Sequence, residues 1–211
     1  MTQKIHSAVQ KIKDALGGEC LALLRYEKDE KNTWIFVVEK VDFTVMESVK
    51  KQLKKINFLI FRKEEIVHGA DVFPIEFLNL KRNVKRVEGE NFFKDLVISK
   101  KDLRWKLEFE LRNKLIYLRE QFLQEKGKAF LPKIFPTFVP IFVALCELFD
   151  VKPKKKFSTT SRAFEKSVGV DLSVFRDLED LKIDKSEISN KIQAVNDAFE
   201  QLAVKVNHLK I

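Results

Sequence analysis

The chain has 211 residues, 45% hydrophobic and 34% charged, which is enough for one large domain or two small ones with a proper core. Its net charge of +9 is spread along the chain, because residues 1–98 carry 18 basic and 15 acidic side chains and residues 99–211 carry 22 and 16. This distribution excludes a basic arm of the kind that binds nucleic acid by charge alone.

Cysteine usage and the N-terminal residues predict a reduced, cytoplasmic protein. Cys20 and Cys146 form neither a CxxC pair nor a disulfide framework, so they predict no metal site. The first residues, MTQKIHSAVQKIKDALGG, lack the apolar core of a signal peptide. Abundant Lys and Glu, with little Cys, Met or Gln, are typical of a thermophile.

The N-terminal residues predict a helix followed by two buried strands. Thr2 is the expected cap of the helix, which carries one apolar stripe and stops at Gly17-Gly18. The apolar runs Cys20 to Tyr26 and Thr33 to Glu39 are typical of strands covered on both faces. The polar residues between them, Glu27 to Asn32, predict a hairpin or a tight connection.

A second helix and a third strand come next. Thr44-x-x-Glu47 is a capping-box pattern and predicts the start of the helix. Phe58 to Phe61 is the third strand candidate, followed by one or two helical turns in RKEEIVHGA. Four lysines of the helix face outward and predict a solvated surface: Lys50, Lys51, Lys54 and Lys55.

The segment Asp71 to Arg86, DVFPIEFLNLKRNVKR, combines an apolar run, one carboxylate and a basic exit. We expect a core strand at the edge of the sheet, since Pro74 cannot donate a ladder hydrogen bond. Glu76 would then leave the core on this strand, either as a metal ligand or as a salt-bridged residue at the rim. Val84 to Val87 predicts a further short strand. The basic exit consists of Lys81, Arg82, Lys85 and Arg86.

From Ser99 onward the pattern predicts helices only. Ser99 caps a long helix that ends at Gly127. Ala129 to Phe149 is long enough for a membrane span, but its prolines and internal charges favour a buried helix entered through an irregular Pro-rich segment. A loop or linker over residues 152–161 precedes the last three predicted helices: Arg162–Val168, Leu172–Leu181, and one starting near Asp184-x-x-Glu187.

The last helix carries a heptad seam from Ile188 to Val206. We expect the seam to pack within its own bundle, with self-association as the alternative. The whole pattern predicts an α+β protein. Residues 1–98 would form a mixed sheet with flanking helices, and residues 99–211 a helical bundle.

The element order of residues 1–98 resembles the nucleotidyltransferase superfamily, with its minimal polymerase-β-like palm. In that family a helix precedes a strand ending in Gly-Ser, the next strand begins with an Asp-x-Asp pair, and a later strand brings a third carboxylate. DVFPIEFLNLKRNVKRVEGENFF is similar to the third-carboxylate strand and the segment after it. DLVISKKDLRWKLEFELRNKLIYLREQFL is similar to the helical extension of bacterial two-domain members.

The resemblance also shows which catalytic motifs are replaced. Tyr26-Glu27 stands where the family has Gly-Ser, and Asn32 and Trp34 stand near its two metal-binding aspartates. Only Glu76 keeps a carboxylate at the third position. Two divalent ions on triphosphate oxygens need several fixed carboxylates, so the resemblance implies a nucleotidyltransferase-like protein without catalysis, acting as a binding or regulatory module.

Two alternatives remain open from the sequence. The first is an active nucleotidyltransferase that uses magnesium on a relocated carboxylate set, Asp29, Glu30 and Glu76. The second is a nucleic-acid-associated protein whose phosphate contacts combine the basic exit, Lys81, Arg82, Lys85 and Arg86, with Lys152, Lys154, Lys155 and Lys156.

The sequence assigns no catalytic residue and no metal site. It implies a cofactor, magnesium, only for the alternative of an active nucleotidyltransferase. His6, His68 and His208 are scattered and predict no nucleophile arrangement. The expected partner is another protein, or a second copy bound through the helical domain. Nucleic acid is a less favoured partner and a membrane is not expected.

Overall fold

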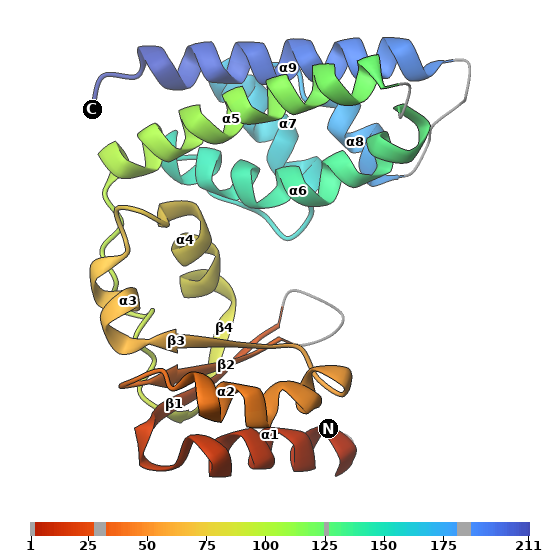
Figure 1. Cartoon of the computed structure of the whole chain (residues 1–211). Coiled ribbons are helices and arrows are strands. Elements are labelled where there is room, and N and C mark those ends of the chain that lie inside the picture. The colour runs from red at the N-terminus through yellow and green to blue at the C-terminus, as the bar shows by residue number, and fades with distance from the viewer. Residues whose placement is uncertain (1–2, 28–32, 125–126, 181–186) are drawn as a thin grey trace. The chain divides into compact units, whose positions relative to one another are not determined.

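A computed structural model describes residues 3–27, 33–124, 127–180 and 187–211 of the chain. They form two compact units, Met1–Ile98 with a mixed sheet and Ser99–Ile211 with helices (Figure 1). The protein is therefore of the α+β class. Thr2, the predicted cap of the first helix, and Asp184, the predicted start of the last helix, lie outside the described residues.

In the first unit, four strands form one sheet among the described residues, in the order β3-β2-β1-β4. Strand β1 is antiparallel to β2 and β4, whereas β3 is parallel to β2. All four predicted strands at these places are confirmed, with small shifts at their ends. The elements are α1 (Gln3–Leu16), η1 (Gly17–Glu19), β1 (Cys20–Tyr26), β2 (Thr33–Val38), α2 (Phe43–Val49), η2 (Lys50–Lys54), β3 (Phe58–Arg62), α3 (Lys63–His68), α4 (Pro74–Asn83) and β4 (Val84–Gly89).

Both faces of the sheet are buried, which explains why β1 and β2 are apolar without alternation. Helices α1 and α2 lie on one face, where Ile12 and Val49 pack against Trp34 and Phe36 (Figure 1). On the other face, Ile35 belongs to a second cluster with three further buried residues from α3, α4 and the segment after β4: Ile66, Phe77 and Phe93.

The expected strand over Asp71 to Arg86 is wrong, because Pro74 to Asn83 forms helix α4. Pro74 occupies the first helical turn, where its missing N–H costs nothing. Ile75, Phe77 and Leu78 are buried while Glu76 is exposed, which is the spacing of a helix face. The acidic first turn and basic last turn also match the helix dipole.

The start of α2 also differs from the prediction. Its N-cap is Asp42 rather than Thr44, and the Asp42 carboxylate accepts hydrogen bonds from the backbone N–H groups of Thr44 (2.7 Å) and Val45 (3.4 Å). These bonds, that of Thr44 first, lower the pKa of Asp42. A carboxylate is the stronger cap because it accepts charge-assisted bonds from two orphan donors.

The second unit is a helical bundle in which α9 runs beside α5 (Figure 1). Ser99 caps α5 as predicted, accepting a hydrogen bond from the backbone N–H of Asp102 at 3.1 Å. The predicted seam of α9 packs inside the unit, with Val195, Phe199 and Leu202 buried. The elements are α5 (Lys100–Leu123), α6 (Gly127–Leu148), α7 (Phe157–Val168), α8 (Ser173–Glu179) and α9 (Ile188–His208).

Three boundaries in this unit correct the sequence analysis. Helix α5 ends at Leu123, and Gly127 begins α6 instead of ending α5. The expected irregular Pro-rich segment is helical, with Pro132, Pro136 and Pro140 inside α6. Their spacing of four places the missing N–H groups on one side of the helix, so the other sides keep their ladder. Helix α7 starts at Phe157, earlier than the expected Arg162.

Phenylalanine rings fill the core of the second unit. Phe138 stacks on Phe175 with ring centroids 3.9 Å apart, and its edge contacts include Phe157 and Phe199. By contrast, Trp105 lies on the outer side of α5 and is 60% exposed. Within α6, Phe130–Leu148 is long and apolar enough to cross a membrane, and half of this stretch is buried inside the unit, as in a core helix.

Candidate functional site

The end of the sheet at the β1–β2 connection is where the resemblance places a catalytic centre. Tyr26 ends β1 and pairs with Thr33 of β2 and Val84 of β4. Beside them, Trp34 pairs with Phe58 at the start of β3. Three sheet strands therefore begin at this end and one finishes there. Asp29, Glu30 and Asn32, which stand between Tyr26 and Thr33 in the sequence, lie outside the described residues.

Glu27 is the carboxylate that the structure describes at this end. Its backbone N–H bonds the carbonyl of Asn83 at 3.3 Å, which ties the exit of β1 to the entry of β4. Its side chain forms ion pairs with Arg25 and Lys85 and is 25% exposed. The hydrogen bonds from Lys85 and then Arg25 lower the pKa of Glu27. Two cations thus hold this carboxylate ionised and neutralise its charge.

Trp34, near the place of the second family aspartate, is a core residue. Its side chain is only 3% exposed and belongs to the cluster beneath α1 and α2. An indole offers one N–H donor and no oxygen ligand. This position therefore contributes packing to the sheet rather than a carboxylate to its rim.

The structure does not place Glu76 on a sheet strand. It lies in the first turn of α4 and is exposed. The strand that follows the helix after β2 is β3, whose sequence FLIFR has no carboxylate. Within residues 3–27, 33–124, 127–180 and 187–211, no group of three or more His, Cys, Asp or Glu side chains is arranged to hold a metal ion.

The predicted basic exit is divided between two elements. Lys81 and Arg82 belong to the last turn of α4, while Lys85 and Arg86 lie on β4, where successive side chains point to opposite faces. The ammonium group of Lys81 donates to the carbonyl of Leu96 at 2.8 Å, and Lys85 pairs with Glu27. The four cations therefore lie on two elements, and Lys81 and Lys85 are already engaged.

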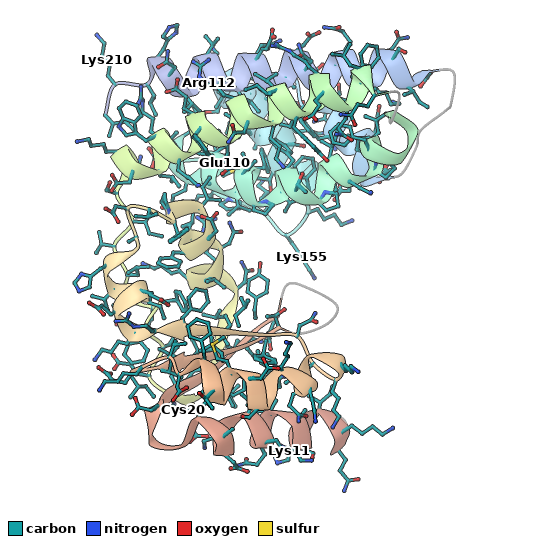
Figure 2. The ribbon with its side chains drawn as sticks, viewed as in Figure 1. Lys11, Cys20, Glu110, Arg112, Lys155 and Lys210 are labelled. Carbon is teal, nitrogen blue, oxygen red and sulfur yellow. The ribbon has the colours of Figure 1, made fainter. Side chains whose placement is uncertain are left out.

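Arg86 lines a hollow of about 490 Å³ in which the charges are mixed. Lys94 contributes a second cation, and Glu90 and Asp95 contribute two carboxylates. The other lysines of the proposed nucleic-acid surface, Lys152, Lys154, Lys155 and Lys156, are exposed before α7 in the second unit. Figure 2 shows Lys155 extending away from its loop.

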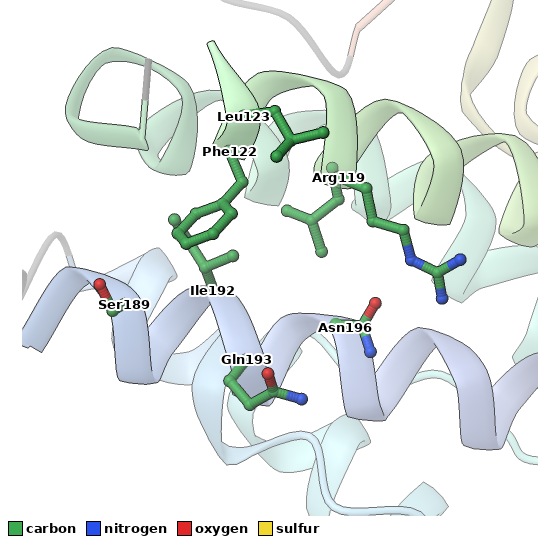
Figure 3. A pocket seen from close by; sticks show the side chains of 8 residues that line it. Arg119, Phe122, Leu123, Ser189, Ile192, Gln193 and Asn196 are labelled. Carbon is green, nitrogen blue, oxygen red and sulfur yellow. The ribbon is translucent and has the colours of Figure 1, made fainter. Parts of the chain in front are cut away.

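A groove of about 440 Å³ lies between α5 and α9 in the second unit (Figure 3). Phe122 and Leu123 of α5 face Ile192 of α9 across it. The opening also has Arg119, which pairs with Glu200 at 2.7 Å. No sequence motif marks this groove, because it depends on how α5 and α9 pack against each other.

A second groove lies in the first unit, between α2 and the edge strand β3. No sequence motif marks it either. Its volume is about 420 Å³, and Lys50 and Glu47 of the α2–η2 segment stand at its side. Its apolar lining consists of Phe43, Met46, Val49, Phe58, Leu59 and Ile60. Three consecutive β3 residues line it, so the groove follows the edge of the strand rather than one face of the sheet.

Comparison with known proteins assigns the chain to no family. No protein-family model matches the chain, and no curated protein matches it.

Proposed function

We propose that this protein is a nucleotidyltransferase-like binding or regulatory module that has lost catalysis. The support is the end of the sheet where β1 stops and β2 begins. The resemblance assigns a phosphate-binding turn and two metal-binding aspartates to this place. The chain instead has Glu27, held between Arg25 and Lys85, and a buried Trp34.

Each replacement opposes the ancestral chemistry for a physical reason. A phosphate turn needs small residues so that backbone N–H groups approach the anion closely. Tyr26-Glu27 supplies a bulky ring and a negative charge instead. A two-metal site needs several fixed oxygens within a few ångströms. Glu27 is already satisfied by two cations, and Glu76 lies on a helix.

Titration calorimetry of the full chain tests the loss of catalysis. ATP, CTP, GTP and UTP are each titrated with and without magnesium, and we expect no magnesium-dependent heat. Tight binding of any nucleotide that requires magnesium would refute the proposal. In that event a Glu76→Gln variant tests the relocated carboxylate set, because loss of the binding in this variant would favour an enzyme using Asp29, Glu30 and Glu76.

A further inference from the structure

The two edges of the sheet differ in their protection. On β4 the exposed side chains include Lys85, Arg86 and Glu88, and the pairing of β4 with β1 is irregular. Charges and irregular pairing are how native proteins block the addition of a further strand. Strand β3 has neither device over Phe58–Phe61, and Leu59 is 45% exposed.

The outer side of β3 offers directional hydrogen bonds. Strand β3 pairs with β2 along five residues, and no other described residue pairs with it. In a parallel pair the backbone groups of every second residue point away from the neighbour. Five residues span about 17 Å, which is the length of an average strand, so another segment has room to pair there.

The groove beside this edge offers apolar contacts. Phe43, the first residue of α2, is 80% exposed, and Met46, Phe58 and Ile60 extend the apolar lining. A segment paired with β3 would direct alternate side chains toward this lining. Backbone pairing combined with side-chain pockets is the mode by which sheet edges recognise extended peptides.

The charge around the groove selects the occupant. The α2–η2 segment beside the groove, residues 43–55, carries one carboxylate, Glu47, and four exposed lysines: Lys50, Lys51, Lys54 and Lys55. Glu47 already pairs with Lys50 at 3.4 Å, and Asp42, just before this segment, caps α2. At the end of β3, Glu64 pairs with Arg62. A second copy of this chain would bring the same positive charge to the edge, whereas an acidic segment would be attracted.

We propose that the β3 edge and the α2 groove bind an extended, acidic segment of a partner protein by strand addition. The inference rests on the binding role proposed above and names its partner class. Apolar side chains of the segment would enter the groove lined by Phe43, Phe58 and Ile60. Its Asp and Glu side chains would face the lysines of the α2–η2 segment, Lys50, Lys51, Lys54 and Lys55.

The test begins with selection of a displayed library of random peptides, about twelve residues long, against the full chain. We expect the enriched peptides to alternate apolar residues with Asp or Glu. NMR titration of the ¹⁵N-labelled chain with the enriched peptide should shift amide signals at Phe58–Arg62 and Phe43–Val49. N-methylating alternate peptide amides should weaken binding at least about tenfold in one register only, because one register faces β3.

Two pairs of variants separate the groove from general surface effects. Phe43→Ser should weaken peptide binding about tenfold, whereas Val97→Ser, at a side chain 83% exposed in the same unit, should not change it. The double variant Lys50→Glu, Lys54→Glu should weaken it by a similar factor. The matched control is Lys154→Glu with Lys155→Glu, which makes the same charge change in the second unit.

Failure to enrich any peptide, equal loss in both N-methylated registers, or shifts confined to other elements would each overturn the inference. So would concentration-dependent dimerisation that Leu59→Lys abolishes, since the occupant would then be a second copy. The nucleotide calorimetry is read separately. Magnesium-dependent nucleotide binding together with this peptide binding refutes the lost catalysis and leaves the strand addition standing.

Discussion

The β3 and β4 edges belong to one sheet but differ in charge and in what lies beside them. Strand β4 is charged, is tied to α1 by the ion pair of Lys13 with Glu88, and closes the end of β1 through Lys85 and Glu27. Strand β3 is apolar and borders a groove. Exposure alone therefore does not distinguish a strand edge that can accept a further strand. The distinguishing features are exposure without charge and a neighbouring cavity that can accept side chains.

The largest expected effect comes from disturbing the close approach of β4 to β1. Gly89 has φ of +71°, and a Cβ there would lie 2.2 Å from the carbonyl oxygen of Leu21. Gly89→Ala should reduce the free energy of unfolding by about 3 kcal/mol, through left-handed backbone strain and a displaced β1. Urea denaturation measures the change. The control is Gly17→Ala, with φ of +54° and open space, at about 1 kcal/mol.

Equal costs at Gly89 and Gly17 would contradict a close approach of β4 to β1. The contrast between the edges would then rest on charge alone.

A charge placed on the apolar edge should make β3 resemble β4. Leu59→Glu changes a side chain that is 45% exposed, so the free energy of unfolding should stay within about 0.5 kcal/mol. Binding of the selected acidic peptide, followed by fluorescence anisotropy, should still fall about tenfold, because the new carboxylate charges the edge and repels the peptide. Unchanged binding would remove Leu59 from the docking edge.

The charged edge should bind nucleic acid only weakly, because Lys81 and Lys85 are already engaged. We expect a duplex oligonucleotide to bind no tighter than about 10⁻⁶ M at physiological salt, as for non-specific contacts. Fluorescence anisotropy measures this affinity between 50 and 200 mM salt, a range over which binding through phosphate contacts weakens strongly. Tighter binding with a steep salt slope, reduced in Arg86→Ala, would favour the nucleic-acid alternative.

The smallest effect concerns the pH dependence of the β4 edge. The folded pKa of Glu27 is lowered by Lys85 and Arg25, so its ion pairs stabilise the fold above the ordinary pKa of 4.5. This contribution is lost as the pH falls from 4.5 through the lower folded value. Carboxyl NMR titration should show the low pKa, and Lys85→Ala should raise it. A Glu27 pKa unchanged by Lys85→Ala would separate the two side chains.

The sequence predicts the strands well because β1, β2 and β3 are short apolar runs bounded by polar residues. It fails for α4 because Ile75, Phe77 and Leu78 fit a half-buried strand as well as a helix face. Pro74 fits the edge of a sheet and the first turn of a helix equally. The choice is made by packing of Phe77 against Phe61 and Phe93, with ring centroids 6.3 and 5.6 Å away.

The functional surfaces were harder to predict than the elements. The sequence pattern places Glu76 on a strand that does not form, and no pattern marks Glu27, because its partners Arg25 and Lys85 come from different strands. The β3 groove depends on how α2 packs beside an edge strand. Phe43, an exposed aromatic at a helix start, is the signal in the sequence that could have indicated it.

The positions of the two tryptophans give each unit its own optical behaviour. Trp34 is 3% exposed in the sheet unit, and Trp105 is 60% exposed in the helical unit. Indole emission moves to longer wavelength when water reaches the ring, so Trp105 already emits close to its unfolded wavelength. A red shift on denaturation would therefore follow the sheet unit almost alone, without any added label. Circular dichroism at 222 nm, dominated by helices, would follow mainly the other unit.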